Sequence, residues 1–155
     1  MATELSPALR MEIELALHEL NADFCYYLDH GETESLVALF TDRAIYSHGH
    51  RLSEGRDAIR ELFGKRNAPG TRTARHIQSG LRLRIVDEKS ATGQSVCLTF
   101  AADELPPITP ATPHLVADFD DEYELCDDGQ WRISRRHIER IFTDSQNTGP
   151  IGSGS

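Results

Sequence analysis

Apolar residues recur at steps of three and four between residues 13 and 28, which predicts a long amphipathic helix. The apolar stripe consists of Ile13, Leu17, Leu20, Phe24 and Leu28. Ser6 followed by Pro7 favours a helix start, because serine caps free N–H groups and proline fits the first helical position. Gly31 favours the end of this helix, since glycine readily adopts the left-handed conformation found at many helix ends.

Two shorter helices and an extended segment are predicted next. The first helix places Leu36, Leu39 and Phe40 on its buried side. Residues 44–48 then read as extended, up to a turn at Gly49. The other helix covers residues 55–63, and its buried positions are Ala58, Ile59, Leu62 and Phe63.

From residue 73 onward the pattern is typical of long strands, predicted at 73–85, 95–100, 114–125 and 131–142. Asp127-Asp-Gly129 between the last two strands is a strong hairpin signal. Helices followed by an antiparallel meander predict an α+β domain, with the helices on one face of a curved sheet. A sheet that curves around a long helix encloses a cone-shaped cavity, in which a small molecule is the expected ligand.

Composition limits the classes of partner. The chain has 155 residues, 39% of them apolar, and we expect one domain over residues 1–145 with a disordered tail at 146–155. The formal charge of −9 argues against a nucleic-acid partner. No membrane span or signal peptide is recognisable, so a cytoplasmic location is expected.

Cysteine and histidine usage points away from disulfides and metals. Cys25, Cys97 and Cys126 are widely spaced and odd in number, which favours free thiols. His48 and His50 lie close together in sequence but lack the spacing of metal ligands. We therefore expect neither a metal nor another cofactor.

One acid and one histidine are the candidate catalytic pair. Asp29 ends the first helix, and His76 lies near the start of the strand at 73–85. A carboxylate that holds an imidazole makes it a competent general base. Simple alternation would place His76 on the face opposite Leu81 and Leu83, so we predict a β-bulge at Gly80 that brings them to one face.

Four motifs, YYLDHGETESLVALFTD at 26–42, GRDAI at 55–59, RHIQSGLRL at 75–83 and YELCDDGQW at 123–131, follow one another in order. Over roughly residues 10–143 they resemble the SnoaL-like branch of the nuclear transport factor 2-like superfamily. The resemblance implies a cone-shaped, curved antiparallel or mixed sheet wrapped around the N-terminal helix, described as an α+β barrel. It also implies a homodimer or a homotrimer.

The same resemblance assigns roles to individual residues. Asp29 and His76 are similar to the Asp–His dyad of two lyases on this fold, scytalone dehydratase and hexachlorocyclohexane dehydrochlorinase. Arg136 falls on an active-site arginine of the dehydrochlorinase, and Tyr46 falls on a cavity tryptophan. Phe24 replaces its catalytic lysine, which argues against dehydrochlorination.

The predicted function is a cofactor-independent, dehydratase-like β-elimination on a small, largely apolar molecule. Tyr26, Tyr27 and His48 complete the candidate substrate-binding residues, although adjacent tyrosines on a helix cannot both face the cavity. An isomerase or polyketide-cyclase-like enzyme using the same cavity is one alternative. A non-catalytic protein, either a small-ligand binder or a structural subunit, is the other.

Overall fold

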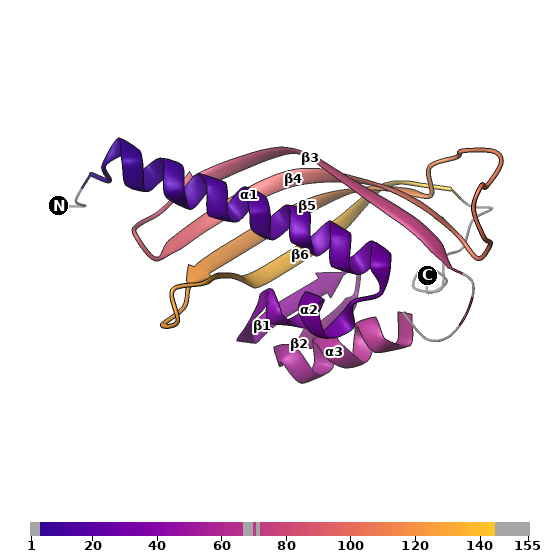
Figure 1. The fold of residues 1–155 in the computed structure, drawn as a ribbon, viewed down its shortest axis with the longest axis horizontal. Coiled ribbons are helices and arrows are strands. Elements are labelled where there is room, and N and C mark those ends of the chain that lie inside the picture. Colours follow the sequence, from indigo (N-terminus) through magenta and orange to yellow (C-terminus); the bar gives the residue numbers. More distant parts are fainter. Residues whose placement is uncertain (1–3, 67–69, 71, 145–155) are drawn as a thin grey trace.

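The computed structural model describes residues 4–66, 70 and 72–144, so the predicted tail at 146–155 lies outside the described residues. The helix α1 runs diagonally across one face of a curved sheet, and the two short helices lie near its C-terminal end (Figure 1). The elements are α1 (Pro7–His30), α2 (Thr33–Ala38), β1 (Phe40–His48), β2 (Arg51–Glu54), α3 (Gly55–Arg66), β3 (Thr73–Ile85), β4 (Ser90–Ala102), β5 (Leu115–Leu125) and β6 (Trp131–Thr143).

The ends of α1 are those that the sequence predicts. The Ser6 side chain accepts a hydrogen bond from the Leu9 N–H at 3.2 Å, which caps the helix start. Gly31 adopts the left-handed conformation, with φ 69°, and its N–H bonds to the carbonyl of Tyr27. The helix thus ends at His30, so Asp29 lies in its last turn and has a fixed position over the sheet.

The sheet is mixed and open. Its six described strands have the order β2-β1-β6-β5-β4-β3, so that β2 and β3 are the two edges. Neighbouring strands are antiparallel except β1 and β6, which pair in parallel. The predicted α+β class is confirmed. The antiparallel meander covers only β3 to β6, because β1 joins the sheet in parallel beside β6. β2 is not predicted by the sequence pattern, because Arg51-Leu-Ser-Glu54 shows no run of alternating apolar residues.

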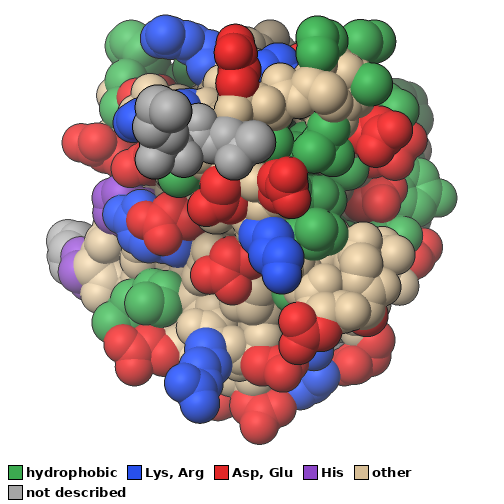
Figure 2. Space-filling model, turned by 90° about the vertical axis from the view of Figure 1, so that its left-hand side faces the viewer, with side chains coloured by type: hydrophobic (Ala, Val, Ile, Leu, Met, Phe, Trp, Pro, Cys, Tyr) green, Lys and Arg blue, Asp and Glu red, His purple; other side chains and the backbone are tan. Residues whose placement is uncertain are grey.

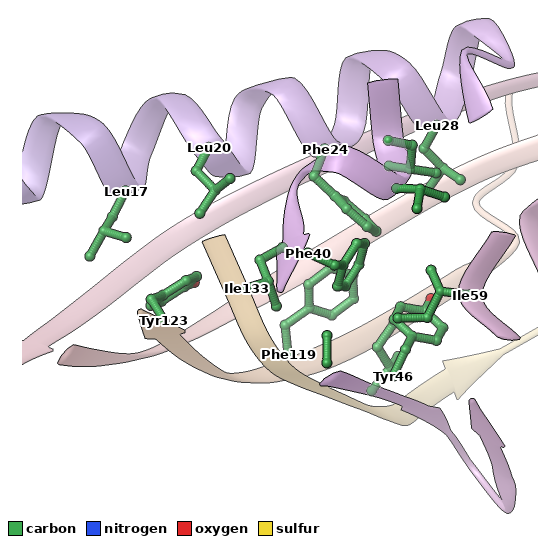
Figure 3. Close-up of a cluster of buried hydrophobic side chains, with 14 of the residues drawn as sticks. Leu17, Leu20, Phe24, Leu28, Phe40, Tyr46, Ile59, Phe119, Tyr123 and Ile133 are labelled. Atoms are coloured by element: carbon green, nitrogen blue, oxygen red, sulfur yellow. The ribbon is translucent and has the colours of Figure 1, made fainter. Parts of the chain in front are cut away.

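The core lies between α1 and the sheet (Figure 3). Phe24 is fully buried at its centre, and its ring meets those of Phe40, Phe63 and Phe119 edge-on at centroid distances of 6.1–6.3 Å. All five residues of the predicted helix stripe are buried. The predicted burial of Ala58 and Leu62 on α3 is only partial, because α3 covers the end of the sheet.

The predicted bulge in β3 is confirmed. Between Ser79 and Arg82 the strand advances three residues while β4 advances two, and Gly80 has a φ of 66°. The extra residue shifts the alternation by one position. His76 before the bulge and Leu83 after it therefore both face α1 and the core.

Charges of both signs cover the end of the molecule where α1 begins. Figure 2 shows Lys and Arg side chains interspersed among Asp and Glu on this face, with a group of hydrophobic side chains at one side. No described helix is long and apolar enough to cross a membrane.

Candidate active site

Asp29 and His76 form a direct contact between the end of α1 and the start of β3. The Asp29 Oδ1 atom lies 2.6 Å from His76 Nδ1, and Asp29 Oδ2 accepts the backbone N–H of His76 at 2.9 Å. Both side chains are nearly buried, at 7% and 10% exposure. Because a carboxylate can only accept, Nδ1 carries the proton and the lone pair resides on Nε2.

The surroundings of His76 favour its neutral form. Burial lowers the pKa of His76 below its ordinary value of 6.5, since the charged imidazolium loses its hydration. The hydrogen bond that His76 donates to Asp29 opposes this change, whereas the positive charges of Arg66 and Arg72 reinforce it. A neutral imidazole held in a fixed tautomer is the form that accepts a proton from a substrate.

A groove of about 410 Å³ reaches His76 between α1 and the edge strand β3. Its lining comes from those two elements alone: His18, Asn21, Ala22, Cys25, His76, Ile77, Gln78 and Leu81. Most of these side chains are small or polar, so the wall can both hydrogen-bond and pack against a ligand.

Arg136 lies behind this wall as a fully buried ion pair. Asp121 is directly opposite it on β5 and accepts two hydrogen bonds of 2.8 Å from its guanidinium. Nη2 also donates to Asn21 Oδ1 at 2.5 Å, and the guanidinium lies between the rings of Phe24 and Phe119. Burial alone would lower the pKa of Arg136, but the Asp121 charge raises it above its ordinary value, so the residue stays charged.

Gln78 links the groove to that ion pair. Its Nε2 donates to Asn21 Oδ1 at 3.0 Å and to Ser95 Oγ at 2.7 Å, and its Oε1 accepts a weak hydrogen bond from Cys25 Sγ at 3.8 Å. The polar wall of the groove is therefore positioned by the buried Arg136 guanidinium, through Asn21.

Arg66, the last residue of α3, is a second buried cation near the dyad. It is 9% exposed, and its Nη1 donates to the carbonyl of Leu28 at 3.3 Å, one residue before Asp29. Burial lowers the pKa of Arg66 to about 10, so it is still charged at neutral pH.

Two predicted binding residues, Tyr46 and Phe24, are part of the core. Tyr46 packs edge-on against Phe40 and Phe63, and burial raises its pKa to about 12. Phe24 lies beside Arg136, with 4.3 Å between its ring centroid and the guanidinium carbon Cζ. Neither residue lines the groove that reaches His76.

The other three predicted binding residues lie apart from the dyad groove. His48 accepts a hydrogen bond from Arg140 Nε at 3.0 Å and faces a separate, small hollow. Tyr26 is 53% exposed and stacks on His30 at the surface, because its side of α1 points to solvent. Tyr27 is half-buried against the core, as adjacency on a helix requires.

Some polar residues of the site were missed although the sequence carries a signal for them. Asn21 lies on the apolar stripe of α1, four residues after Leu17, and is buried. Asp121 falls between Phe119 and Tyr123 at an inward position of β5. A polar residue at a core position of an amphipathic element needs a buried partner, which is a testable sign of a network.

The three cysteines are free thiols. Among the residues that the structure describes, no three His, Cys, Asp or Glu side chains are grouped as a metal ion would require.

Comparison with known proteins places the chain in a family. The model of the SnoaL-like domain matches residues 9–137, which is most of the chain. No curated protein matches the sequence significantly.

Solved structures share the fold. A putative scytalone dehydratase from Novosphingobium aromaticivorans is 24% identical, with a TM-score of 0.80 over 97% of this chain and 100% of that one. The hexachlorocyclohexane dehydrochlorinase LinA-type3 from Novosphingobium barchaimii is 20% identical, with a TM-score of 0.75 over 90% and 93%. A point variant of Rv3472, a Mycobacterium tuberculosis protein of unknown function, is 24% identical, with a TM-score of 0.74 over 87% and 79%.

Proposed function

The chain belongs to the SnoaL-like family, and from this premise we propose that it is a cofactor-independent lyase with Asp29 and His76 as its general-base dyad. The proposed reaction is a dehydratase-like β-elimination on a small, largely apolar molecule. The observation that carries the proposal is the 2.6 Å contact between Asp29 Oδ1 and His76 Nδ1 beside a groove.

The geometry supports a simple division of roles. Asp29 fixes the tautomer of His76 and stabilises the imidazolium that forms when Nε2 takes a proton. The same imidazolium can then return the proton to the leaving hydroxyl, so no external acid is needed. Two of the structural neighbours are named for dehydration and dehydrochlorination, which are both eliminations.

The buried arginine assists from behind. Arg136 is fully buried and does not line the groove, so its guanidinium acts on the site by holding the Asn21 amide, which in turn holds Gln78 in the groove wall. Phe24 beside it provides no cation for a leaving chloride, which favours loss of water over loss of halide.

The test is turnover of a panel of small β-hydroxy ketones, followed by the ultraviolet absorbance of the enone product. Replacing His76 with Ala should lower kcat/KM by about 10²–10⁴ on any compound that turns over. Asp29→Asn should lower it by a smaller factor, because the imidazole remains in place. His50→Ala is the matched control, because it removes an exposed histidine in the turn between β1 and β2 and should leave kcat/KM unchanged.

Equal rates for the wild type and the His76→Ala variant would refute the dyad. Binding of panel compounds without turnover would instead favour a ligand-binding protein.

A further inference from the structure

The amide group of Gln78 has one possible orientation in the wall of the groove that reaches His76. Its neighbour Asn21 has two anchors of opposite kind, because the Arg136 guanidinium can only donate and the Leu17 carbonyl can only accept. Asn21 therefore turns its oxygen to Arg136 and its nitrogen to Leu17. The Gln78 atom that lies 3.0 Å from this oxygen must be a donor, which makes it Nε2.

This orientation leaves Gln78 Oε1 with a weak partner. Both hydrogens of Nε2 are used, one by Asn21 and the other by Ser95 Oγ at 2.7 Å. Asn21 also lines the groove, but its oxygen already accepts two hydrogen bonds and its nitrogen donates two, the second to Tyr123. Within the described part of the chain, Gln78 Oε1 accepts only from the Cys25 thiol, at 3.8 Å, and a thiol is a weak donor. A stronger donor on a ligand would displace this thiol at little cost.

Gln78 and His76 present their side chains to the same groove. They are two residues apart on β3, before the bulge at Gly80, and both side chains bond to residues of α1. Side chains at this spacing leave one face of a strand about 7 Å apart. Cys25, which contacts Gln78 Oε1, lines the groove of about 410 Å³ together with them. A small ligand that touches His76 at one end therefore reaches Gln78 Oε1 with the other.

We propose that Gln78 determines substrate specificity: its Oε1 accepts a hydrogen bond from a donor group of the substrate, either a hydroxyl or an N–H. This inference rests on the proposed function, since it places the substrate in the same groove. It narrows the substrate class to molecules that carry such a donor about 7 Å from the position where His76 acts. The donor is retained in the product, because the leaving group must lie within reach of His76.

Indole and benzofuran test the proposal by binding alone. The two molecules have nearly the same shape, but indole carries an N–H donor where benzofuran carries a ring oxygen that can only accept. An NMR titration of the protein gives a Kd for each probe and requires no turnover. We expect the wild type to bind indole about two- to tenfold more tightly than benzofuran, which is the contribution of one hydrogen bond.

Gln78→Met removes the amide but keeps a side chain of similar length, so the ratio of the two Kd values should fall to about one. Because the ratio is taken within each variant, a general change in the shape of the groove affects both probes and cancels. If this variant does not fold, as checked by circular dichroism, Gln78→Asn replaces it, since asparagine withdraws the oxygen by one methylene.

Gln94→Met is the matched control. Gln94 is exposed on β4 between the buried residues Gly93 and Ser95, so it points to the face of the sheet opposite α1. It borders a separate hollow on that face and does not line the groove that reaches His76. The ratio of the two Kd values should stay at the wild-type value in this variant.

The inference fails if the wild type binds benzofuran as tightly as indole, binds neither probe, or keeps its preference for indole in the Gln78→Met variant. Turnover that depends on His76 together with any of these results would remove Gln78 alone. A preference for indole that depends on Gln78, without turnover of any compound, would keep this site and remove the lyase.

Discussion

Replacing Arg136 with Met tests the buried ion pair behind the groove. The change removes the guanidinium while keeping a long, flexible side chain between Phe24 and Phe119. It leaves the Asp121 carboxylate fully buried, with the Tyr123 hydroxyl as its remaining donor at 2.7 Å. The Asn21 amide oxygen also loses one of its two donors.

The expected loss follows from that stranded charge. Removing one partner of a buried ion pair typically costs about 3–5 kcal/mol. For a domain of this size, each kcal/mol lowers the melting temperature by roughly 2–4 °C, so a fall of about 6–20 °C is expected. The neighbouring Arg135→Met is the matched control, because Arg135 forms only long, exposed ion pairs of 3.5–3.8 Å, and it should cost about 1 kcal/mol or less.

Urea unfolding of Arg136→Met, Asp121→Asn and the variant that combines them gives the coupling free energy between the two residues. Asp121→Asn should also be strongly destabilising, since it strands the cation. The double variant Arg136→Met with Asp121→Asn buries no unpaired charge, so its cost should fall short of the sum by roughly 1–3 kcal/mol. Losses that add to within about 0.5 kcal/mol would refute the ion-pair reasoning.

Three further outcomes are expected. Gly93→Ala should lower the free energy of unfolding, measured in urea, by about 1–3 kcal/mol, because a Cβ there would lie 2.9 Å from the Tyr123 ring. A Cβ at Gly64 on α3 meets nothing within 4 Å, so Gly64→Ala should raise that free energy by about 0.5–1 kcal/mol. Equal effects of the two variants would contradict this reasoning. Burial and the Arg140 charge hold the pKa of His48 at about 4 in the folded protein, so the unfolded chain binds more protons between pH 6.5 and 4. The free energy of unfolding should therefore fall as the pH drops through this range, and it should fall less in the His48→Gln variant. The pKa of His76 is lowered in the same direction, so the acid limb of any pH–rate profile should lie below 6.5; a limb above that value would mean another base.

The sequence predicts the fold and the dyad where local signals agree. The stripe that ends at Leu28 sets the face of α1, and the cap at Gly31 stops the helix just past Asp29. Gly80 then supplies the one-residue shift that alternation requires for His76 to face that helix end. Each step depends on neighbours in sequence, or on a single glycine.

The remaining features depend on pairings between distant segments. The partner of Arg136 is decided by the register of β5 and β6, which brings Asp121 opposite it. Arg66 becomes buried because α3 packs at the end of the sheet, and periodicity within α3 cannot predict which charge lies beside Leu28. Such charges are identified by three-dimensional neighbours, so they appear only once the strands are aligned.

The parallel pairing of β1 with β6 also sets an order of events during synthesis. Ser47 and His137, which hydrogen-bond across that pairing at 2.7 Å, are 90 residues apart. While the ribosome is still making β3 to β5, the inner edge of β1 has no strand to pair with, and closing so long a loop slows folding. An open edge of this kind can recruit other chains, so the nascent protein is most exposed to aggregation just before β6 emerges. The strand that carries Arg136 is thus also the one that ends this vulnerable interval.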